Sequence, residues 1–218
     1  MKETKLKFGV IGSGSWATAL IKILSENNND INWYIRNKEN VEFIKKNSHN
    51  PNYLSSVELN LKKLKISAEI NEVVEASNVI IIAVPSEYVN DEMKKISVDI
   101  SNKIIICALK GLVPETNLLF GEHMQKYFDI SPNKFLVIGG PCHAEEVALE
   151  KLSYLTVGSS NLELCKVISK KFSCKYIKIK VSDDVIGIEY ASMLKNIFAL
   201  AVGISNGLGY GDNYQSVL

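Results

Sequence analysis

The sequence has no surplus of charge of either sign, because 25 lysines and arginines stand against 24 aspartates and glutamates in 218 residues. It therefore has no basic field that would hold a nucleic acid or an anionic membrane surface. The longest uninterrupted apolar run, Val79 to Pro85, is short against the roughly 20 residues that cross a bilayer. The charged start, Met1 to Lys5, leads directly into a strand-like segment without the apolar core of a signal peptide. We therefore expect a cytoplasmic protein with no membrane span.

Cysteine and histidine are also scarce. The four cysteines form no CxxC pair, and no cluster of histidines accompanies them. Without a secretion signal the thiols are expected to be reduced, so neither a disulfide scaffold nor a metal site is predicted. His49 and His123 stand among polar residues on segments predicted to lie at the surface, and we assign neither a function. The cysteines are Cys107, Cys142, Cys165 and Cys174.

Short β-branched segments alternate with segments of helical period along most of the chain. Several of the expected strands are apolar without alternation, as strands buried on both faces are. This rhythm predicts an α/β fold with a Rossmann-type, doubly wound and mostly parallel sheet. The expected strands are Leu6–Ile11, Ile31–Ile35, Lys65–Ser67, Asn78–Val84, Lys103–Ala108, Phe135–Gly139, Tyr154–Val157 and Lys175–Ile179. The expected helices are Ser15–Asn27, Lys38–Lys46, Ile70–Glu75, Glu87–Ile96, Glu115–Tyr127, Ala144–Leu149 and Leu162–Lys171.

The alternation stops near Val181, and the pattern that follows is purely helical. Apolar residues recur at three- and four-residue intervals over Asp183–Ala201, with Asp183 or Asp184 as the expected cap. A glycine-rich stretch, Gly203–Gly211, is expected to follow this helix. A long apolar helix with nothing to cover it predicts a second, helical domain and self-association. We therefore divide the chain into a sheet domain at 1–182 and the incomplete start of a helical domain at 183–218.

A glycine pattern lies between the first expected strand and the first expected helix, where the sequence reads G-x-G-x-x-A. Gly12 permits the tight turn, Gly14 lets the backbone approach a pyrophosphate, and Ala17 is small enough for close helix–sheet contact. The helix start offers free N–H groups to the phosphates. The pattern predicts dinucleotide binding, the alternative being a plain tight turn between a strand and a helix. The residues assigned to the cofactor here are Gly12, Gly14, Ser15 and Trp16.

About 20 residues later, where an acidic residue would select NAD, the second strand runs into Arg36-Asn37-Lys38. Arg36 can stack on the adenine or pair with a 2′-phosphate. NADP is therefore expected to be accepted at least as well as NAD, although the sequence leaves the choice between NAD and NADP open. The alternative for Arg36 is a solvated basic turn.

A series of further motifs runs along the chain, and their order and spacing are specific as a set. They are Gly12–Leu20, Trp33–Arg36, Asn50–Leu54, Ala83–Ser86, Lys110-Gly111, Gly139–Val147, Leu194–Ile197 and Gly203–Gly209. From Lys7 to the last residue, the chain resembles the NAD(P)-dependent glycerol-3-phosphate dehydrogenases of bacteria. It departs from their pattern at Ala17, where a glycine is common, and at Cys142-His143, where Ser-Phe or Ser-His is more usual. It also ends about a third before the family pattern does, ahead of the arginine that holds the substrate phosphate.

The resemblance implies reversible hydride transfer between a nicotinamide and C2 of glycerol 3-phosphate, giving dihydroxyacetone phosphate and serving phospholipid synthesis. It implies that Lys195 is the general base and acid, a role that a lysine fills when burial or a nearby cation lowers its pKa. Lys110 follows a strand end, where ligands bind in open α/β sheets, and is implied to contact both cofactor and substrate. The resemblance further implies that Gly140 and Cys142 contact the substrate and that Ala144 lines the cofactor site.

Two other interpretations stay open at this point. One is a different oxidoreductase built from a Rossmann domain and a helical domain, such as a hydroxyacid dehydrogenase or a ketopantoate reductase. The segment Gly139–Val147 and the pair Lys110-Gly111 argue against it. The other is a dinucleotide-binding fragment without turnover, which the end of the chain at Leu218 suggests. A homodimer is expected for the full-length protein.

Overall fold

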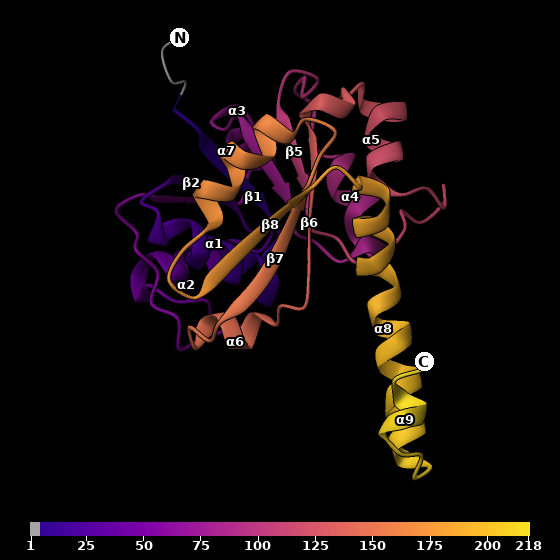
Figure 1. The fold of residues 1–218 in the computed structure, drawn as a ribbon. Coiled ribbons are helices and arrows are strands. Elements are labelled where there is room, and N and C mark those ends of the chain that lie inside the picture. The colour runs from indigo at the N-terminus through magenta and orange to yellow at the C-terminus, as the bar shows by residue number, and fades with distance from the viewer. Residues whose placement is uncertain (1–4) are drawn as a thin grey trace.

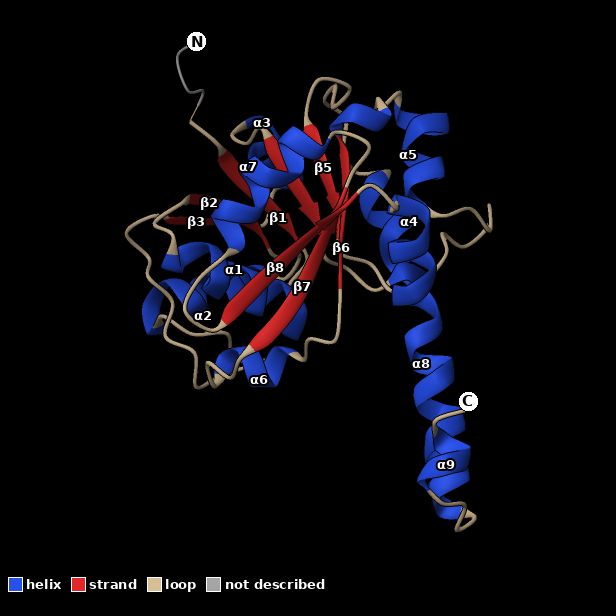
Figure 2. Ribbon diagram, viewed as in Figure 1, coloured by secondary structure: helices blue, strands red, loops and turns tan. Residues whose placement is uncertain are grey.

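The computed structural model describes residues 5–218, which form one eight-stranded sheet with helices on both of its faces (Figures 1 and 2). The strand order is β3-β2-β1-β4-β5-β6-β7-β8, and every neighbouring pair is parallel except β6 and β7. The predicted Rossmann-type, mostly parallel sheet is therefore confirmed. The strands are β1 (Lys7–Ile11), β2 (Asp30–Tyr34), β3 (Leu64–Ser67), β4 (Val79–Ile82), β5 (Ile104–Cys107), β6 (Phe135–Gly139), β7 (Ser153–Gly158) and β8 (Ile177–Ser182).

Two apolar cores lie on the two faces of this sheet. The first is shared with α1, α2, α6 and α7, and the second with α3, α4 and α5. Alternate residues of β1 supply the two cores, since Phe8 belongs to the first and Ile11 to the second. The helices are α1 (Ser15–Glu26), α2 (Lys38–Asn47), α3 (Ile70–Glu75), α4 (Val89–Met93), α5 (Phe120–Phe128), α6 (Ala144–Ala148), α7 (Leu162–Phe172), α8 (Val185–Gly207) and α9 (Asp212–Gln215), with short 3₁₀ turns η1 (Ser86–Tyr88) and η2 (Pro132–Lys134).

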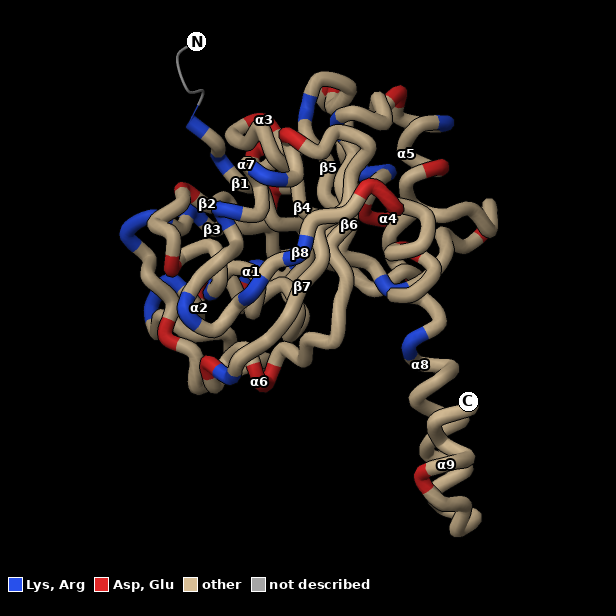
Figure 3. The backbone as a smooth tube through the Cα atoms, in the orientation of Figure 1, with Lys and Arg blue, Asp and Glu red and all other residues tan. Residues whose placement is uncertain are grey.

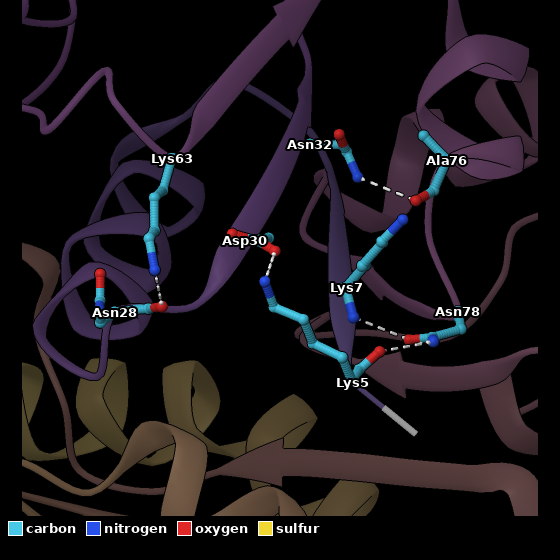
Figure 4. Close-up of polar contacts among 8 residues, drawn as sticks. All are labelled: Lys5, Lys7, Asn28, Asp30, Asn32, Lys63, Ala76 and Asn78. Atoms are coloured by element: carbon cyan, nitrogen blue, oxygen red, sulfur yellow. Dashed lines mark hydrogen bonds and ion pairs between the residues drawn. The ribbon is translucent and has the colours of Figure 1, made fainter. Parts of the chain in front are cut away.

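Polar contacts tie together the amino ends of the central strands (Figure 4). The Asn78 side chain, just before β4, accepts a hydrogen bond from the Lys7 backbone N–H at 2.9 Å and donates one to the Lys5 carbonyl at 3.2 Å. Lys5 Nζ also lies 2.6 Å from the Asp30 carboxylate at the start of β2. These contacts lie at the amino ends of the strands, which leaves the carboxyl ends available for a site.

The start of α8 is capped as the sequence predicts, but its end is not where we expected. The Asp184 side chain accepts a hydrogen bond from the Gly187 N–H at 2.8 Å. The predicted end near Ala201 is wrong, because α8 continues through Gly203 to Gly207 and turns only at Gly209, whose φ is +79°. An isolated glycine costs a helix only about 1 kcal/mol, which the surrounding apolar residues tolerate. Helix α9 folds back along α8 (Figure 1).

Much of α8 projects away from the sheet and carries few charges (Figure 3). Its early turns contact β6 and β7, whereas Ile197, Leu200 and Ile204 are more than half exposed. By length and composition alone α8 could cross a membrane, which the longest uninterrupted apolar run did not indicate. Its apolar residues form no long uninterrupted run, because Glu189 and Lys195 lie within the helix.

Two other helix predictions need correction. The helix expected over Glu115–Tyr127 begins only at Phe120, because Glu115 and Asn117 have φ values of +71° and +53° and cannot continue a right-handed helix. The helix expected over Glu87–Ile96 is divided into η1 and the shorter α4.

The expected surface position of His123 is wrong as well. Its side chain is buried among the rings of Phe120, Tyr127 and Phe128, and burial lowers the pKa of this imidazole. The polar residues beside it in sequence point outward on the other face of α5, while His123 points into the core. The structure has all four cysteines as free thiols.

Phe172 of α7 packs edge-on against Phe8 of β1, with ring centroids 6.0 Å apart and both side chains fully buried. We expect Phe172→Ala to lower the free energy of unfolding by about 3–5 kcal/mol, because it leaves a cavity between α7 and the sheet. Val167→Ala on the same helix should change it by less than about 0.5 kcal/mol, since Val167 is half exposed. Urea denaturation followed by circular dichroism measures both, and equal losses would contradict this packing role.

Candidate active site

A row of hollows follows the carboxyl ends of the parallel strands. The Arg36 cavity is lined by Gly12, Ser13, Gly14, Tyr34, Arg36, Tyr53, Val84, Pro85, Tyr88 and Glu92. The Trp16 cavity, of about 300 Å³, is lined by Gly14, Ser15, Trp16, Ala83, Val84, Pro85, Ser86, Ala108 and Lys110. The lysine cavity, only about 20 Å³, is lined by Trp16, Ala108, Leu109, Lys110, Ile138, Gly139, Gly140, Cys142, Leu155, Ser192 and Lys195. Neighbouring cavities share lining residues, so they form one continuous surface.

The glycine loop between β1 and α1 is held in place by its glycines and by two side chains from elsewhere, those of Trp33 and Asn50. A Cβ on Gly12 would lie 2.3 Å from the Ala83 carbonyl oxygen, and φ there is +125°, so only glycine fits. Gly14 has nothing within 4 Å on its Cβ side, which leaves its backbone open to a ligand. The indole N–H of Trp33 donates to the Gly12 carbonyl at 2.6 Å. The loop is therefore rigid where it meets the sheet and open where phosphates would bind.

Asn50 braces the same loop, a role that the sequence analysis missed. Its buried amide N–H group donates to the Ser13 carbonyl at 3.1 Å and to Thr18 Oγ1 at 2.9 Å. Its side-chain oxygen accepts from the backbone N–H of Asn52 and of Tyr53, which forms a turn and places Tyr53 at the Arg36 cavity. The Asn-Pro-Asn sequence signals a turn of this kind, but not which loop the turn supports.

At the Arg36 cavity, the predicted arginine stands beside an acidic residue that the sequence analysis also missed. The side chain of Glu92, on α4, is buried, and Glu92 Oε1 lies 4.0 Å from the Arg36 guanidinium. The Tyr34 hydroxyl donates to Glu92 Oε2 at 3.1 Å. Burial, and then the charge of Glu92, raise the pKa of Tyr34 to about 12. Nothing in the local sequence of α4 marks Glu92 as a neighbour of β2.

The lysine cavity brings together four residues that the sequence analysis assigned to the substrate. Lys110 follows β5, and both burial and the charge of Lys195 lower the pKa of its amine. Lys195 Nζ is shielded from solvent and has no hydrogen-bond partner among residues 5–218. Cys142 is buried against this cavity, and burial raises the pKa of its thiol. Gly140 has φ +135°, and a Cβ there would lie 2.7 Å from the Tyr154 carbonyl oxygen.

Ala144 lies apart from this row of cavities. It is the first residue of α6, is 7% exposed, and belongs to the core that α6 forms with α1. His143 precedes it at the start of α6, with an exposed side chain that makes no capping hydrogen bond. Ser15 and Trp16, by contrast, line the Trp16 cavity as the first two residues of α1. In the part of the chain that the structure describes, no group of three or more metal-ligating side chains is present.

Lys195 is positioned by the packing of α8 on β6. Gly139 admits α8 closely, because a Cβ there would lie 2.7 Å from Ile188 and 2.8 Å from Ser192. Glu189 Oε1 accepts a hydrogen bond from the Gly121 N–H at 3.1 Å, which ties α8 to the start of α5. Burial raises the pKa of Glu189 to about 7. A side chain buried at an early turn of α8 therefore controls the placement of the helix that carries Lys195.

The raised pKa of Glu189 predicts a pH dependence of stability. The folded protein holds this proton more tightly than the unfolded chain, so the stability is fully present below about pH 4.5 and decreases as the pH rises through about 7. At 1.36 kcal/mol per pKa unit, the loss is at most roughly 3 kcal/mol. Glu189→Gln should remove this decrease in urea unfolding measured from pH 5 to pH 8.

His123 acts in the opposite direction, because burial lowers the pKa of its imidazole. The difference between wild type and Glu189→Gln therefore isolates Glu189. Glu163→Gln, at an exposed carboxylate of α7, should keep the wild-type pH dependence. A decrease of wild-type size in Glu189→Gln would contradict the assignment.

Family models and related sequences all match this chain to glycerol-3-phosphate dehydrogenases. Residues 7–165 match the family model for the NAD-dependent glycerol-3-phosphate dehydrogenase N-terminus, and residues 184–218 match the model for its C-terminus. The glycerol-3-phosphate dehydrogenase [NAD(P)+] of Macrococcus caseolyticus is 37% identical, over 98% of this chain and 64% of that protein. That of Bacillus pumilus is 34% identical, over 97% of this chain and 62% of that protein.

Solved structures show the same fold. The crystal structure of glycerol-3-phosphate dehydrogenase from Coxiella burnetii has a TM-score of 0.85 at 26% identity and covers 98% of this chain and 65% of that one. The structure of Plasmodium falciparum glycerol-3-phosphate dehydrogenase has a TM-score of 0.88 at 26% identity. The match covers 99% of this chain and 63% of that one. The chain thus spans slightly less than two thirds of the length of these relatives. On the match over residues 7–165 and on these relatives, the chain belongs to the NAD-dependent glycerol-3-phosphate dehydrogenase family.

Proposed function

We propose that the protein interconverts glycerol 3-phosphate and dihydroxyacetone phosphate with NAD(P) or its reduced form, and so supplies glycerol 3-phosphate for phospholipid synthesis. The observation that supports this most is the continuous surface from Arg36, past the glycine loop, to Lys110 and Lys195. A dinucleotide is long and needs such an extended site at the carboxyl ends of the strands. Because the chain belongs to this family, we do not propose a hydroxyacid dehydrogenase or a ketopantoate reductase.

In this proposal the glycine loop and the start of α1 hold the cofactor. Gly12 and Gly14 bring the backbone close to the pyrophosphate, and the free N–H groups at Ser15 and Trp16 stabilise its charge. Arg36 lies at the adenosine end, and Lys110 at the opposite end of the surface. The open Cβ side of Gly14 supports this fit. The nicotinamide, when bound, supplies or accepts the hydride. Ala144 would act through the packing of α6 against α1 rather than through direct contact with the cofactor.

The two lysines would handle the charge and the proton of the substrate. Lys110 polarises the oxygen on C2, because a cation stabilises the negative charge that develops there. Lys195 takes the proton of the C2 hydroxyl in oxidation and returns it in reduction. Its amine is shielded from solvent and has no hydrogen-bond partner among the described residues, so it is free to bond to that hydroxyl. Gly140 permits close approach of the substrate to the backbone. Cys142 contributes its thiol to the same cavity, although a thiol is a weaker hydrogen-bond donor than a serine hydroxyl.

We further propose that residues 1–182 act as the dinucleotide-binding domain and that 183–218 begin the helical substrate domain. In this arrangement α8 is a core helix of that domain and not a membrane span. Glu189 and Lys195 support this, because ionisable residues are rare and costly in membrane helices. A cytoplasmic, homodimeric full-length enzyme without a bound nucleic acid or metal is the corresponding expectation.

The role of Lys195 is tested by replacing it with alanine in the active enzyme. We expect kcat for dihydroxyacetone phosphate reduction to fall at least ~10²-fold, which is the usual contribution of a positioned acid–base group. Dinucleotide affinity should change less than kcat, because no residue of the glycine loop from Gly12 to Gly14 lines the lysine cavity. Lys126→Ala, at an exposed lysine of α5, is the control and should keep wild-type kcat. Near-normal kcat in Lys195→Ala would refute the role, and binding without any turnover in the wild type would favour a non-catalytic dinucleotide-binding protein.

Arg36 is tested by its effect on the two cofactors. Arg36→Ala should weaken NADP binding by about tenfold and NAD binding less, because a charge-assisted contact to the 2′-phosphate is lost. Isothermal titration calorimetry gives both dissociation constants. Lys38→Ala, at the exposed lysine that pairs with Glu69, is the matched control. An equal loss for both cofactors would leave Arg36 only a stacking role on the adenine.

A further inference from the structure

Glu92 is a buried carboxylate on the wall of the cofactor surface, and the proposed reaction leaves it without a role. Its side chain is 6% exposed, whereas glutamate is rarely buried without a partner or a function. It lines the Arg36 cavity together with Tyr34, Arg36 and the glycine loop. Any group that binds beside Arg36 therefore also meets this carboxylate.

The partners of Glu92 link α4 to the end of β2. Its Oε2 accepts the Tyr34 hydroxyl at 3.1 Å, and Tyr34 is the last residue of β2. Its Oε1 accepts from Lys95 Nζ at 2.9 Å and lies 4.0 Å from the Arg36 guanidinium. The carboxylate thus stands beside the end of β2, which is where dinucleotide-binding domains of this fold carry the acidic residue that binds the adenosine ribose. In this chain Arg36 occupies that point in the sequence, and the carboxylate of Glu92 comes from α4 instead.

This placement has opposite consequences for the two dinucleotides. A ribose 2′-hydroxyl can donate a hydrogen bond to a carboxylate, as it does to the acidic residue at the end of β2 elsewhere. A 2′-phosphate brings negative charge beside a shielded negative group, and such like-charge contacts are strongly unfavourable. Glu92 also neutralises part of the positive potential of Arg36, the one residue that favoured NADP on sequence grounds.

We propose that Glu92 is the residue that makes NAD the preferred cofactor, by supplying from α4 the carboxylate that is missing at the end of β2. This inference rests on the proposed dinucleotide function. It differs from the sequence-based expectation that NADP is accepted at least as well as NAD, because that expectation considered Arg36 without its neighbour.

The test compares NAD⁺ and NADP⁺ binding by isothermal titration calorimetry in wild type and Glu92→Gln. Glutamine keeps the length of the side chain and its acceptor for the Tyr34 hydroxyl but removes the charge. We expect wild type to bind NAD⁺ about tenfold or more tightly than NADP⁺. Glu92→Gln should reduce that ratio by about tenfold, mainly through tighter NADP⁺ binding. Glu42→Gln is the matched control, because Glu42 forms the same i,i+3 pair with Lys45 on exposed α2, and it should leave the ratio unchanged.

A second variant keeps the inference testable if Glu92→Gln does not fold. In Lys95→Ala the carboxylate stays and the cation 2.9 Å from its Oε1 is gone, so the preference for NAD⁺ should increase beyond the wild-type ratio. A wild type that binds both cofactors equally, or a ratio that Glu92→Gln leaves unchanged, would overturn the role of Glu92 while dinucleotide binding stands. A wild type that binds neither cofactor would instead overturn the proposed function itself.

Discussion

The close approach of the first turn to the fourth strand is the constraint on which the site depends. The backbone at Gly12 lies so near the Ala83 carbonyl that no side chain fits between them. This contact stands at the point where the strand order reverses, between β1 and β4, which is where open α/β sheets form a ligand crevice. The side chains of Trp33, Asn50 and Thr18 each donate a hydrogen bond to a carbonyl of the same loop. Asn50 also donates a hydrogen bond to the Thr18 hydroxyl. The start of α1 is thereby held in one orientation before any ligand binds, which reduces the ordering cost of binding.

Charge is distributed along the surface in a way that suits an elongated, anionic ligand. A carboxylate and a guanidinium stand together at one end, at Glu92 and Arg36. The open backbone of the glycine loop occupies the middle, and the two lysine amines converge at the other end. Burial, and then the charge of Lys195, lower the pKa of Lys110. The lysine end thus places two amines against one small cavity.

The helix that carries Lys195 depends on contacts at its early turns. Gly139 and Gly158 let Ile188 approach the sheet, and Glu189 bonds to the start of α5. Beyond Lys195 the apolar side chains of α8 are largely exposed. The lysine therefore sits at the boundary between the packed and the projecting parts of the helix. The lysine cavity is therefore formed by residues at the strand ends of the sheet and by Lys195 from the helix that follows the sheet.

Local patterns in the sequence determined the alternation of strands and helices, the glycine turn, the Asp184 cap and the position of Lys110 after a strand, because these depend on neighbours within a few residues. The motifs also indicated the family. Local patterns misjudged the end of α8, the start of α5 and the burial of His123, where packing and backbone conformation override composition. Only the tertiary structure decided that Glu92 meets Arg36, that Asn50 braces the glycine loop, and that Ala144 packs in the core rather than at the cavities. Each of those contacts joins elements far apart in the chain, and burial and charge act through space, so no spacing along the sequence specifies them.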